Sequence, residues 1–246
     1  MTWLKRFGID LIGAHVDGVR AIRALPWLFG VLIAWELAQH VVEVRIGFFT
    51  SVDAARAVQE DGGRMLLGWI KMLSVYVGGF FVLRQLAGRV NAPIGTAALR
   101  YLPYLAYALI AFALIFYAGR WAPDRVDEAR AVVALAQIAI EPLLMLWVVS
   151  AATDGEVRTP WQSARMLGWR YAYALPLFFV GRIPVNAVHQ LLNRYAMGQP
   201  PALLWPMLVL DAITVGLIIA VIPAIAVRVA RRVREHVASR PALALA

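Results

Sequence analysis

Six long apolar segments constrain this chain more than any other feature of its sequence. They run through residues 24–44, 65–86, 99–119, 131–152, 169–191 and 203–227. Each is long enough to cross a hydrocarbon layer about 30 Å thick as an α-helix, which rises about 1.5 Å per residue. In such a layer only helices and closed barrels satisfy the backbone hydrogen bonds, and barrel strands are shorter and alternate in polarity. The sequence therefore predicts an all-α, polytopic membrane protein, a bundle of about six transmembrane helices.

The composition agrees with this prediction and narrows the range of partners. The chain is 61% hydrophobic, whereas soluble domains are about 45–50% apolar. The net charge of +9 comes from bases at the ends of the apolar segments, so it indicates attraction to anionic lipid headgroups and not to nucleic acid. Because cysteine is absent, disulfides, thiol catalysis and cysteine-ligated metals are excluded. We predict membrane lipids as partners, membrane proteins as further candidates, and no cofactor.

The whole chain is predicted to be one membrane domain with three parts. Residues 1–23 have helical amphipathic spacing, but Asp10, His15 and Asp17 are too polar for the hydrocarbon core, so this helix should lie in the interface plane. Residues 24–227 hold the six spans, and residues 228–246 form a basic cytoplasmic tail. The bases predicted to contact lipid headgroups are Lys5, Arg6, Arg228, Arg231, Arg232 and Arg234.

Basic residues are divided unequally between the loops on the two sides of the predicted membrane. Of 24 lysines and arginines, two lie deep inside the apolar segments (Lys71 and Arg182), seven lie in the loops or at the segment ends on one side, and the remaining fifteen lie on the other side. Cytoplasmic loops carry the excess of bases, so we predict that both termini are cytoplasmic, in the inner membrane of a bacterium. The seven bases on the outer side are Arg45, Arg56, Arg64, Arg120, Arg125, Arg130 and Arg194.

Two short motifs suggest an internal repeat. The first segment is entered through Arg23-Ala-Leu-Pro26-Trp-Leu and the third through Arg100-Tyr-Leu-Pro103-Tyr-Leu, so both read Arg-x-Leu-Pro-aromatic-Leu. Residues 159–170, before the fifth segment, have a similar amphipathic character without the motif. One interpretation is a threefold repeat of one interfacial helix and two spans. The other is the common pattern of a base, a first-turn proline and an aromatic residue where helices enter membranes.

A further pattern connects the fourth and fifth segments. Glu141-Pro142 lies within the fourth segment, Asp154-Gly155 follows its end, and Trp161-Gln-Ser-Ala-Arg165-Met-Leu-Gly168 leads into the fifth. This order of features resembles the glycerophosphodiester-phosphodiesterase-type membrane domain and related six-helix bacterial inner-membrane proteins. In that family the phosphodiesterase chemistry belongs to a separate soluble domain. The resemblance therefore implies a six-helix membrane domain and no enzyme activity in this chain.

Five full charges and two histidines lie inside the predicted spans, near the midplane or in the outer half. Each charge costs about 2.5–3.5 kcal/mol at the helix centre on insertion scales, so such residues usually face the bundle interior. We predict an intramembrane polar cluster that contains Glu36, His40, Lys71, Glu141, Arg182, His189 and Asp211. One interpretation is a polar cavity that opens outward, and the other is a set of buried ion pairs that specify helix register.

The predicted topology also suggests particular pairs within this cluster. Arg182 and Asp211 lie at similar predicted depths on consecutive segments joined by a short loop, so we expect them to form an ion pair. Lys71 should then pair with Glu36 or with Glu141.

The sequence contains no complete catalytic, nucleotide-binding or metal-binding motif. Glu36, His40 and Glu43 share one helical face, but a metal there would need a further ligand, and His189 is the only other deep histidine. We predict no catalytic and no metal-ligating residues. The favoured function is a non-enzymatic membrane protein in envelope or lipid homeostasis, or a subunit of a membrane assembly. The alternatives are a small transporter or permease component with an outward-facing polar cavity, and an intramembrane lipid-modifying enzyme.

Overall fold

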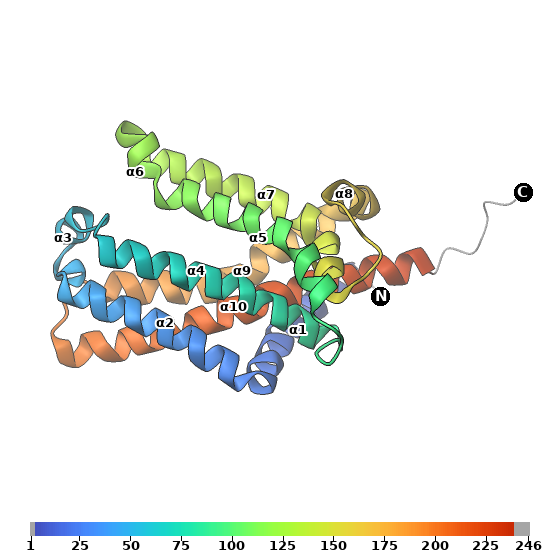
Figure 1. Cartoon of the computed structure of the whole chain (residues 1–246), viewed down its shortest axis with the longest axis horizontal. Coiled ribbons are helices and arrows are strands. Elements are labelled where there is room, and N and C mark those ends of the chain that lie inside the picture. Colours follow the sequence, from blue (N-terminus) through green and yellow to red (C-terminus); the bar gives the residue numbers. More distant parts are fainter. Residues whose placement is uncertain (1–2, 239–246) are drawn as a thin grey trace, which may run out of the picture.

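The computed structural model describes residues 3–238, and within this range every regular element is a helix (Figure 1). The α-helices are α1 (Trp3–Ala24), α2 (Pro26–Arg45), α3 (Val52–Ala57), α4 (Gly62–Leu86), α5 (Gly95–Phe116), α6 (Ala118–Trp121), α7 (Val126–Thr153), α8 (Pro160–Leu167), α9 (Tyr171–Ala196) and α10 (Pro201–Ala238). Three short 3-10 turns, η1 (Phe48–Thr50), η2 (Pro123–Arg125) and η3 (Gly168–Arg170), join some of them. The all-α prediction is confirmed.

Five helices are long and apolar enough to cross a membrane. They are α2, α4, α5, α7 with its preceding turn, and α10. The predicted fifth span corresponds to α9, a helix of 26 residues. Its apolar character is interrupted by Arg182, His189 and Arg194, and it is not among these five helices.

Local sequence signals explain where several helices begin and end. Pro26 occupies the first turn of α2, where a missing N–H costs nothing. The side chains of Asp61 and Thr159 cap α4 and α8 by accepting hydrogen bonds from the backbone N–H three residues later. Helix α7 ends at Asp154, which adopts the left-handed conformation at φ 55°, and the next N–H donates to the carbonyl of Ser150 at 2.8 Å.

Helix α10 lies at the centre of the bundle and packs against α1, α2, α4, α7 and α9. Its face is built from small and branched residues, including Ala220, Val221, Ala224 and Ile225, each at most 1% exposed. Gly18 allows α1 to approach the α10 backbone closely, because a Cβ at that position would lie 3.1 Å from Val221 Cγ2 and 3.3 Å from the Val221 backbone nitrogen. Helices α5 and α7 pair with each other beside this central group.

Figure 1 shows that the bundle has two distinct ends. Helices α1 and α8 and the described C-terminal end of α10 lie at one end, which we name the α1/α8 end. Helices α3 and α6 lie at the opposite end, together with the turn between α9 and α10, and we name this the α3/α6 end. The long helices therefore run back and forth between the two ends.

Two features of the structure bear on the predicted C-terminal tail and on the predicted repeat. Helix α10 continues past residue 227 to Ala238, so the predicted basic tail is part of the last helix up to this residue. The rest of the predicted tail, residues 239–246, lies outside the described residues, as do residues 1–2. Pro26 stands in the first turn of α2, whereas Pro103 lies inside α5. A loop at residues 87–94, and no interfacial helix, precedes α5. The two motifs thus occupy different positions in their helices.

Candidate functional site

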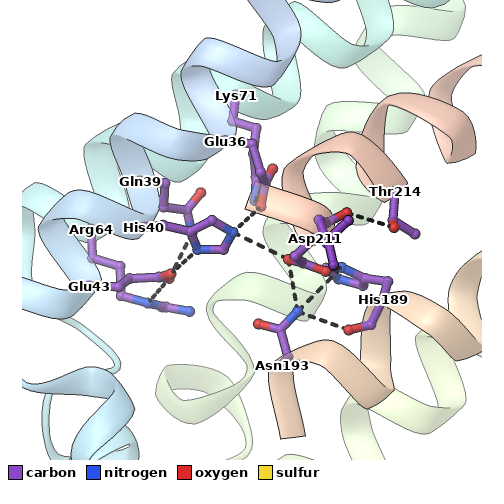
Figure 2. Close-up of polar contacts among 11 residues, drawn as sticks. Glu36, Gln39, His40, Glu43, Arg64, Lys71, His189, Asn193, Asp211 and Thr214 are labelled. Carbon is purple, nitrogen blue, oxygen red and sulfur yellow. Dashed lines mark hydrogen bonds and ion pairs between the residues drawn. The ribbon is translucent and has the colours of Figure 1, made fainter. Parts of the chain in front are cut away.

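One face of α2 carries four buried polar side chains. Glu36, Gln39, His40 and Glu43 occur at spacings of three and four residues, which place them on the same side of a helix. Each is at most 6% exposed. Figure 2 shows that they point toward residues from α4, α9 and α10, so that four helices contribute to one polar network nearer to the α3/α6 end.

The imidazole of His40 is held from one side by Glu43. The His40 Nδ1 atom lies 3.1 Å from Glu43 Oε2. The other oxygen of Glu43 accepts hydrogen bonds from Gln39 Nε2 and from Arg64 Nε, both at 2.9 Å. Because an ionised carboxylate is only an acceptor, the contact with Glu43 places a proton on Nδ1 of His40.

The Nε2 atom of His40 faces two more carboxylates. It lies 3.2 Å from Asp211 Oδ2 and 3.6 Å from Glu36 Oε1, yet it makes no hydrogen bond. The side chains of His40, Glu36 and Asp211 are only 3%, 2% and 0% exposed, so water does not surround them. Nitrogen and oxygen lone pairs that face one another in a buried space repel unless a positive charge lies between them.

Each of these two carboxylates has a further partner besides His40. Lys71 of α4 places its ammonium 3.1 Å from Glu36 Oε2. Asp211 of α10 accepts hydrogen bonds from His189 Nδ1 at 2.6 Å and from Asn193 Nδ2 at 2.9 Å, both on α9 (Figure 2). Asn193 also donates to the His189 carbonyl at 3.0 Å, which ties the two α9 residues together.

The network contains more acid than permanent base. Its carboxylates are Glu36, Glu43 and Asp211, and its permanent cations are Arg64 and Lys71. With both histidines neutral the formal charge is −1. Buried charge without compensation is costly, so the arrangement favours the uptake of one positive species.

Five of the seven residues predicted to form one intramembrane cluster lie together in this network. They are Glu36, His40, Lys71, His189 and Asp211, and Lys71 pairs with Glu36, one of its two expected partners. The sequence analysis placed Glu43 on one helical face with Glu36 and His40, but it missed Gln39, Arg64 and Asn193. The spacing on α2 signals Gln39, whereas Arg64 resembles a loop base in the sequence, and no local pattern marks Asn193.

Glu141 and Arg182 lie in a different part of the bundle. Glu141 accepts a hydrogen bond from the Tyr104 hydroxyl at 3.2 Å and lines a cavity of about 100 Å³ with Tyr76 and Tyr101. The Arg182 guanidinium lies 4.8 Å from the centre of the Phe178 ring, a cation–π contact. Among residues 3–238, neither Glu141 nor Arg182 forms an ion pair within 4.0 Å.

The expected Arg182–Asp211 pair is wrong, because the assumed ends of the two helices were wrong. Helix α9 continues to Ala196 and α10 begins at Pro201, so the turn is centred near residue 199. In antiparallel neighbours, residues at similar distances from the turn lie level with each other. Asp211 is therefore level with His189, and Arg182 lies about two helical turns farther along α9.

A second acid–base cluster joins α1 to α10 at the α1/α8 end. Asp10, at 2% exposure, accepts hydrogen bonds from Arg232 at 2.8 and 3.1 Å, from Arg228 at 3.3 Å and from the Tyr173 hydroxyl at 2.6 Å. Arg228 also contacts Asp17 at 2.6 Å. Two of the bases predicted to contact lipid headgroups, Arg228 and Arg232, therefore bind acidic residues of α1. Arg231 donates to the Leu86 carbonyl, while Lys5, Arg6 and Arg234 are exposed.

The docking of α1 should be insensitive to pH until the medium is strongly acidic. Burial alone raises the pKa of Asp10, but its hydrogen bonds from Arg232 and Tyr173 and the charges of Arg232 and Arg228 outweigh burial and hold that pKa below the ordinary 3.8. A carboxyl with a lowered pKa stabilises the folded state above its unfolded pKa, and this contribution disappears as the pH falls through the folded value. The docking can be followed by the fluorescence anisotropy of a dye attached to the single cysteine of Lys5→Cys. This anisotropy should stay high from pH 8 to pH 4 and fall only below pH 3.8.

Asp10→Asn in the same labelled background should give low anisotropy at every pH, because the two guanidinium groups lose their shared anion. A midpoint between pH 5 and 7 would contradict the assignment of this docking to Asp10.

Comparisons with protein-family models, with curated proteins and with solved structures find no match to this chain.

Proposed function

We propose that the protein is a non-enzymatic, multi-pass protein of a bacterial inner membrane that binds a cation in the buried network around His40. Within this proposal α9 is the sixth crossing and both termini are cytoplasmic, so that the α3/α6 end faces outward. The general setting is envelope or lipid homeostasis, or a subunit of a membrane assembly, with movement of a small cation as the transport variant.

The sixth crossing is supported by the way α9 places its polar residues. Helix α9 packs along α10, and its His189 and Asn193 side chains point to Asp211 in the bundle interior. Polar residues that face the interior of a bundle avoid the cost of lipid exposure. The mean polarity of α9 therefore understates its ability to cross a membrane.

Labelling of single cysteines will test the six crossings, because the natural chain has no cysteine. Glu156→Cys lies before α8, and Gln199→Cys lies in the turn between α9 and α10. In right-side-out membrane vesicles, an impermeant maleimide should label position 199 at once and position 156 only after permeabilisation.

Asn91→Cys, in the loop between α4 and α5, serves as the control for the inner side and should behave like position 156. Labelling of positions 156 and 199 from the same side would mean that α9 does not cross, and the proposed topology would be abandoned.

The charge of the buried network is the observation that supports cation binding. Three carboxylates and two permanent cations lie within one buried cluster, and the unbonded Nε2 of His40 lies between two of the carboxylates. A purely structural set of ion pairs would gain nothing from an excess acid in a medium of low dielectric constant. A cation that enters from the α3/α6 end supplies the missing positive charge.

Thermal unfolding in mild detergent will test cation binding. A ligand that binds only the folded state stabilises it by about 2.7 kcal/mol at one hundred times its Kd. After removal of bound ions with a chelator, Na⁺, K⁺, Mg²⁺, Ca²⁺, Mn²⁺ and Zn²⁺ chlorides would be added separately. At least one should raise the Tm of the natural chain and leave the Tm of Asp211→Asn unchanged. Glu60→Gln, at an exposed carboxylate outside the network, is the matched control and should respond like the natural chain.

If no cation changes the Tm, or if Asp211→Asn responds as the natural chain does, the network is structural and the proposed function fails. Reconstituted vesicles then distinguish binding from transport, because only a transporter accumulates the stabilising cation against an imposed gradient.

Contact with lipid headgroups remains part of the proposal for the α1/α8 end. Lys5, Arg6 and Arg234 are exposed there, and α1 presents the exposed apolar side chains of Trp3 and Leu4 beside them. Bases next to exposed apolar residues on an amphipathic helix are typical of a segment that lies on an anionic membrane surface.

A further inference from the structure

We infer that Glu36, His40 and Asp211 form a binding site for one divalent metal ion of the zinc class, held by the imidazole Nε2 atom and one oxygen from each carboxylate. This inference rests on the proposed cation binding and names the cation and its ligands. The three ligand atoms come from two helices, α2 and α10, and all lie within 4.8 Å of one another.

The distances between these atoms match the spacing that a metal imposes. Zinc binds histidine nitrogen and carboxylate oxygen at about 2.0–2.2 Å, so two ligands of a tetrahedral site lie about 3.4 Å apart. In this protein Nε2 of His40 lies 3.2 Å from Asp211 Oδ2 and 3.6 Å from Glu36 Oε1. Both distances from Nε2 are therefore close to the spacing of ligands in a tetrahedral site, and the two carboxylate oxygens lie within 4.8 Å of each other.

An independent observation is the unsatisfied state of the histidine nitrogen that faces this point. Nε2 of His40 is buried and makes no hydrogen bond, whereas both oxygens of Glu36 contact Lys71. Buried polar atoms in proteins are nearly always paired, and an exception calls for a bound partner or a functional role. A cation at this point would contact Nε2 and both carboxylates and would satisfy all three groups together.

The groups behind the three ligands are arranged as in metal sites. Metal-bound histidine usually donates its other ring N–H to a carboxylate, which fixes the ring and raises its basicity. Glu43 accepts from Nδ1 of His40 in this way, and Gln39 and Arg64 hold Glu43 in place. His189 and Asn193 orient Asp211 in the same manner.

The ligand set selects the class of ion. Calcium and magnesium prefer sites made only of oxygen, whereas imidazole with carboxylates suits zinc and neighbouring divalent ions. Because no thiol is present, copper(I) has no soft thiolate ligand here. A divalent ion changes the formal charge of the network from −1 to +1, and Lys71, whose side chain is 19% exposed, has room to withdraw from Glu36.

Calorimetric titration of the chain with ZnCl₂ in detergent will test the site, on protein purified without a polyhistidine tag. One ion should bind per chain, and CoCl₂ should give the visible absorption of four-coordinate cobalt. His40→Ala should weaken binding by at least about 100-fold, and Glu43→Gln, which removes only the support of the ring, by about 10–100-fold. His15→Ala is the matched control, because His15 lies on α1 and contacts the Leu11 carbonyl, outside the network.

Lys71→Met adds a test in the opposite direction. Removal of the competing ammonium should tighten zinc binding by about tenfold or more, as expected for the loss of a like charge worth at least about 1.4 kcal/mol. A structural role of the network predicts no such gain. Circular dichroism of every variant without metal will check that the helices are retained.

Two results would overturn the inference. One is equal zinc binding by the natural chain and His40→Ala, and the other is no binding of zinc or cobalt at all. If Na⁺ or Ca²⁺ nevertheless stabilises the natural chain and not Asp211→Asn, the proposed cation binding stands and only the metal assignment fails. If no ion binds, a proton on His40 supplies the missing charge and both proposals fail.

Discussion

Replacement of Lys71 by methionine, in metal-free protein, is expected to lower the free energy of unfolding by roughly 3–5 kcal/mol, the usual cost of removing one partner of a buried ion pair. The Lys71 ammonium lies 3.1 Å from Glu36 Oε2, and the Glu36 side chain is 2% exposed. Without the ammonium, the Glu36 carboxylate has no positive charge to compensate it. It still lies close to the Asp211 carboxylate, because both contact Nε2 of His40. Unfolding in mixed micelles, followed by far-ultraviolet circular dichroism, measures the change.

Two further variants make this result specific to the pair. Glu36→Gln combined with Lys71→Met should recover most of the lost free energy, because no buried charge is left unpaired. Arg120→Met removes one partner of the Arg120–Glu60 pair, whose side chains are 61% and 48% exposed, and should cost at most about 1 kcal/mol. If Lys71→Met costs no more than Arg120→Met, Lys71 does not compensate Glu36.

Arg84→Met is expected to destabilise the protein by at least about 3 kcal/mol, since hydrogen bonds from a charged donor contribute about 1.5–3 kcal/mol each. Arg84 is 2% exposed near the end of α4. Its guanidinium donates to the carbonyls of Ala152 at 3.0 Å, Pro93 at 3.3 Å and Ala92. It thereby holds the loop at residues 87–94 against the end of α7, and its loss leaves these carbonyls without their donor.

The shape of the side chain and not only its charge should matter at this position. Arg84→Lys keeps the charge but loses the planar fork that reaches several carbonyls at once, so it should recover only part of the stability. Arg89→Met, at an exposed arginine in the adjacent loop, is the control and should change the unfolding free energy by less than about 0.5 kcal/mol. Equal losses for Arg84→Met and Arg89→Met would show that the buried guanidinium does not hold the loop.

The sequence alone was sufficient for the helical class and for the approximate helix positions. Runs of more than twenty apolar residues determine this much, because a lipid environment leaves the backbone few alternatives to a helix. Sequence spacing also predicted that Glu36, His40, Lys71, His189 and Asp211 would gather, since a charge near mid-span must face inward. The Glu36–Lys71 pair was one of two that the predicted topology allowed.

The tertiary structure decided which residues touch. Sequence position gives the depth of a residue along its helix, but a contact also depends on how far each helix extends and how it is rotated about its axis. A few extra residues at the ends of α9 and α10 brought His189 and not Arg182 to Asp211. Glu141 and Arg182 lie outside the network around His40, and they contact Tyr104 and the Phe178 ring respectively.

Bases near helix ends also show that sequence position alone does not decide which groups a residue contacts. By sequence, Arg84 and Arg228 are equivalent to any other base at a membrane surface. In the structure Arg84 is buried against three carbonyls, and Arg228 binds Asp10 and Asp17, more than 200 residues away along the chain. Whether such a base meets lipid or protein depends on which distant segment packs beside it. The sequence thus determined the helices and the depths of their charges, while the packing of α1, α2, α4 and α9 against α10 decided the partners, because lateral contacts depend on side-chain fit among all the helices together.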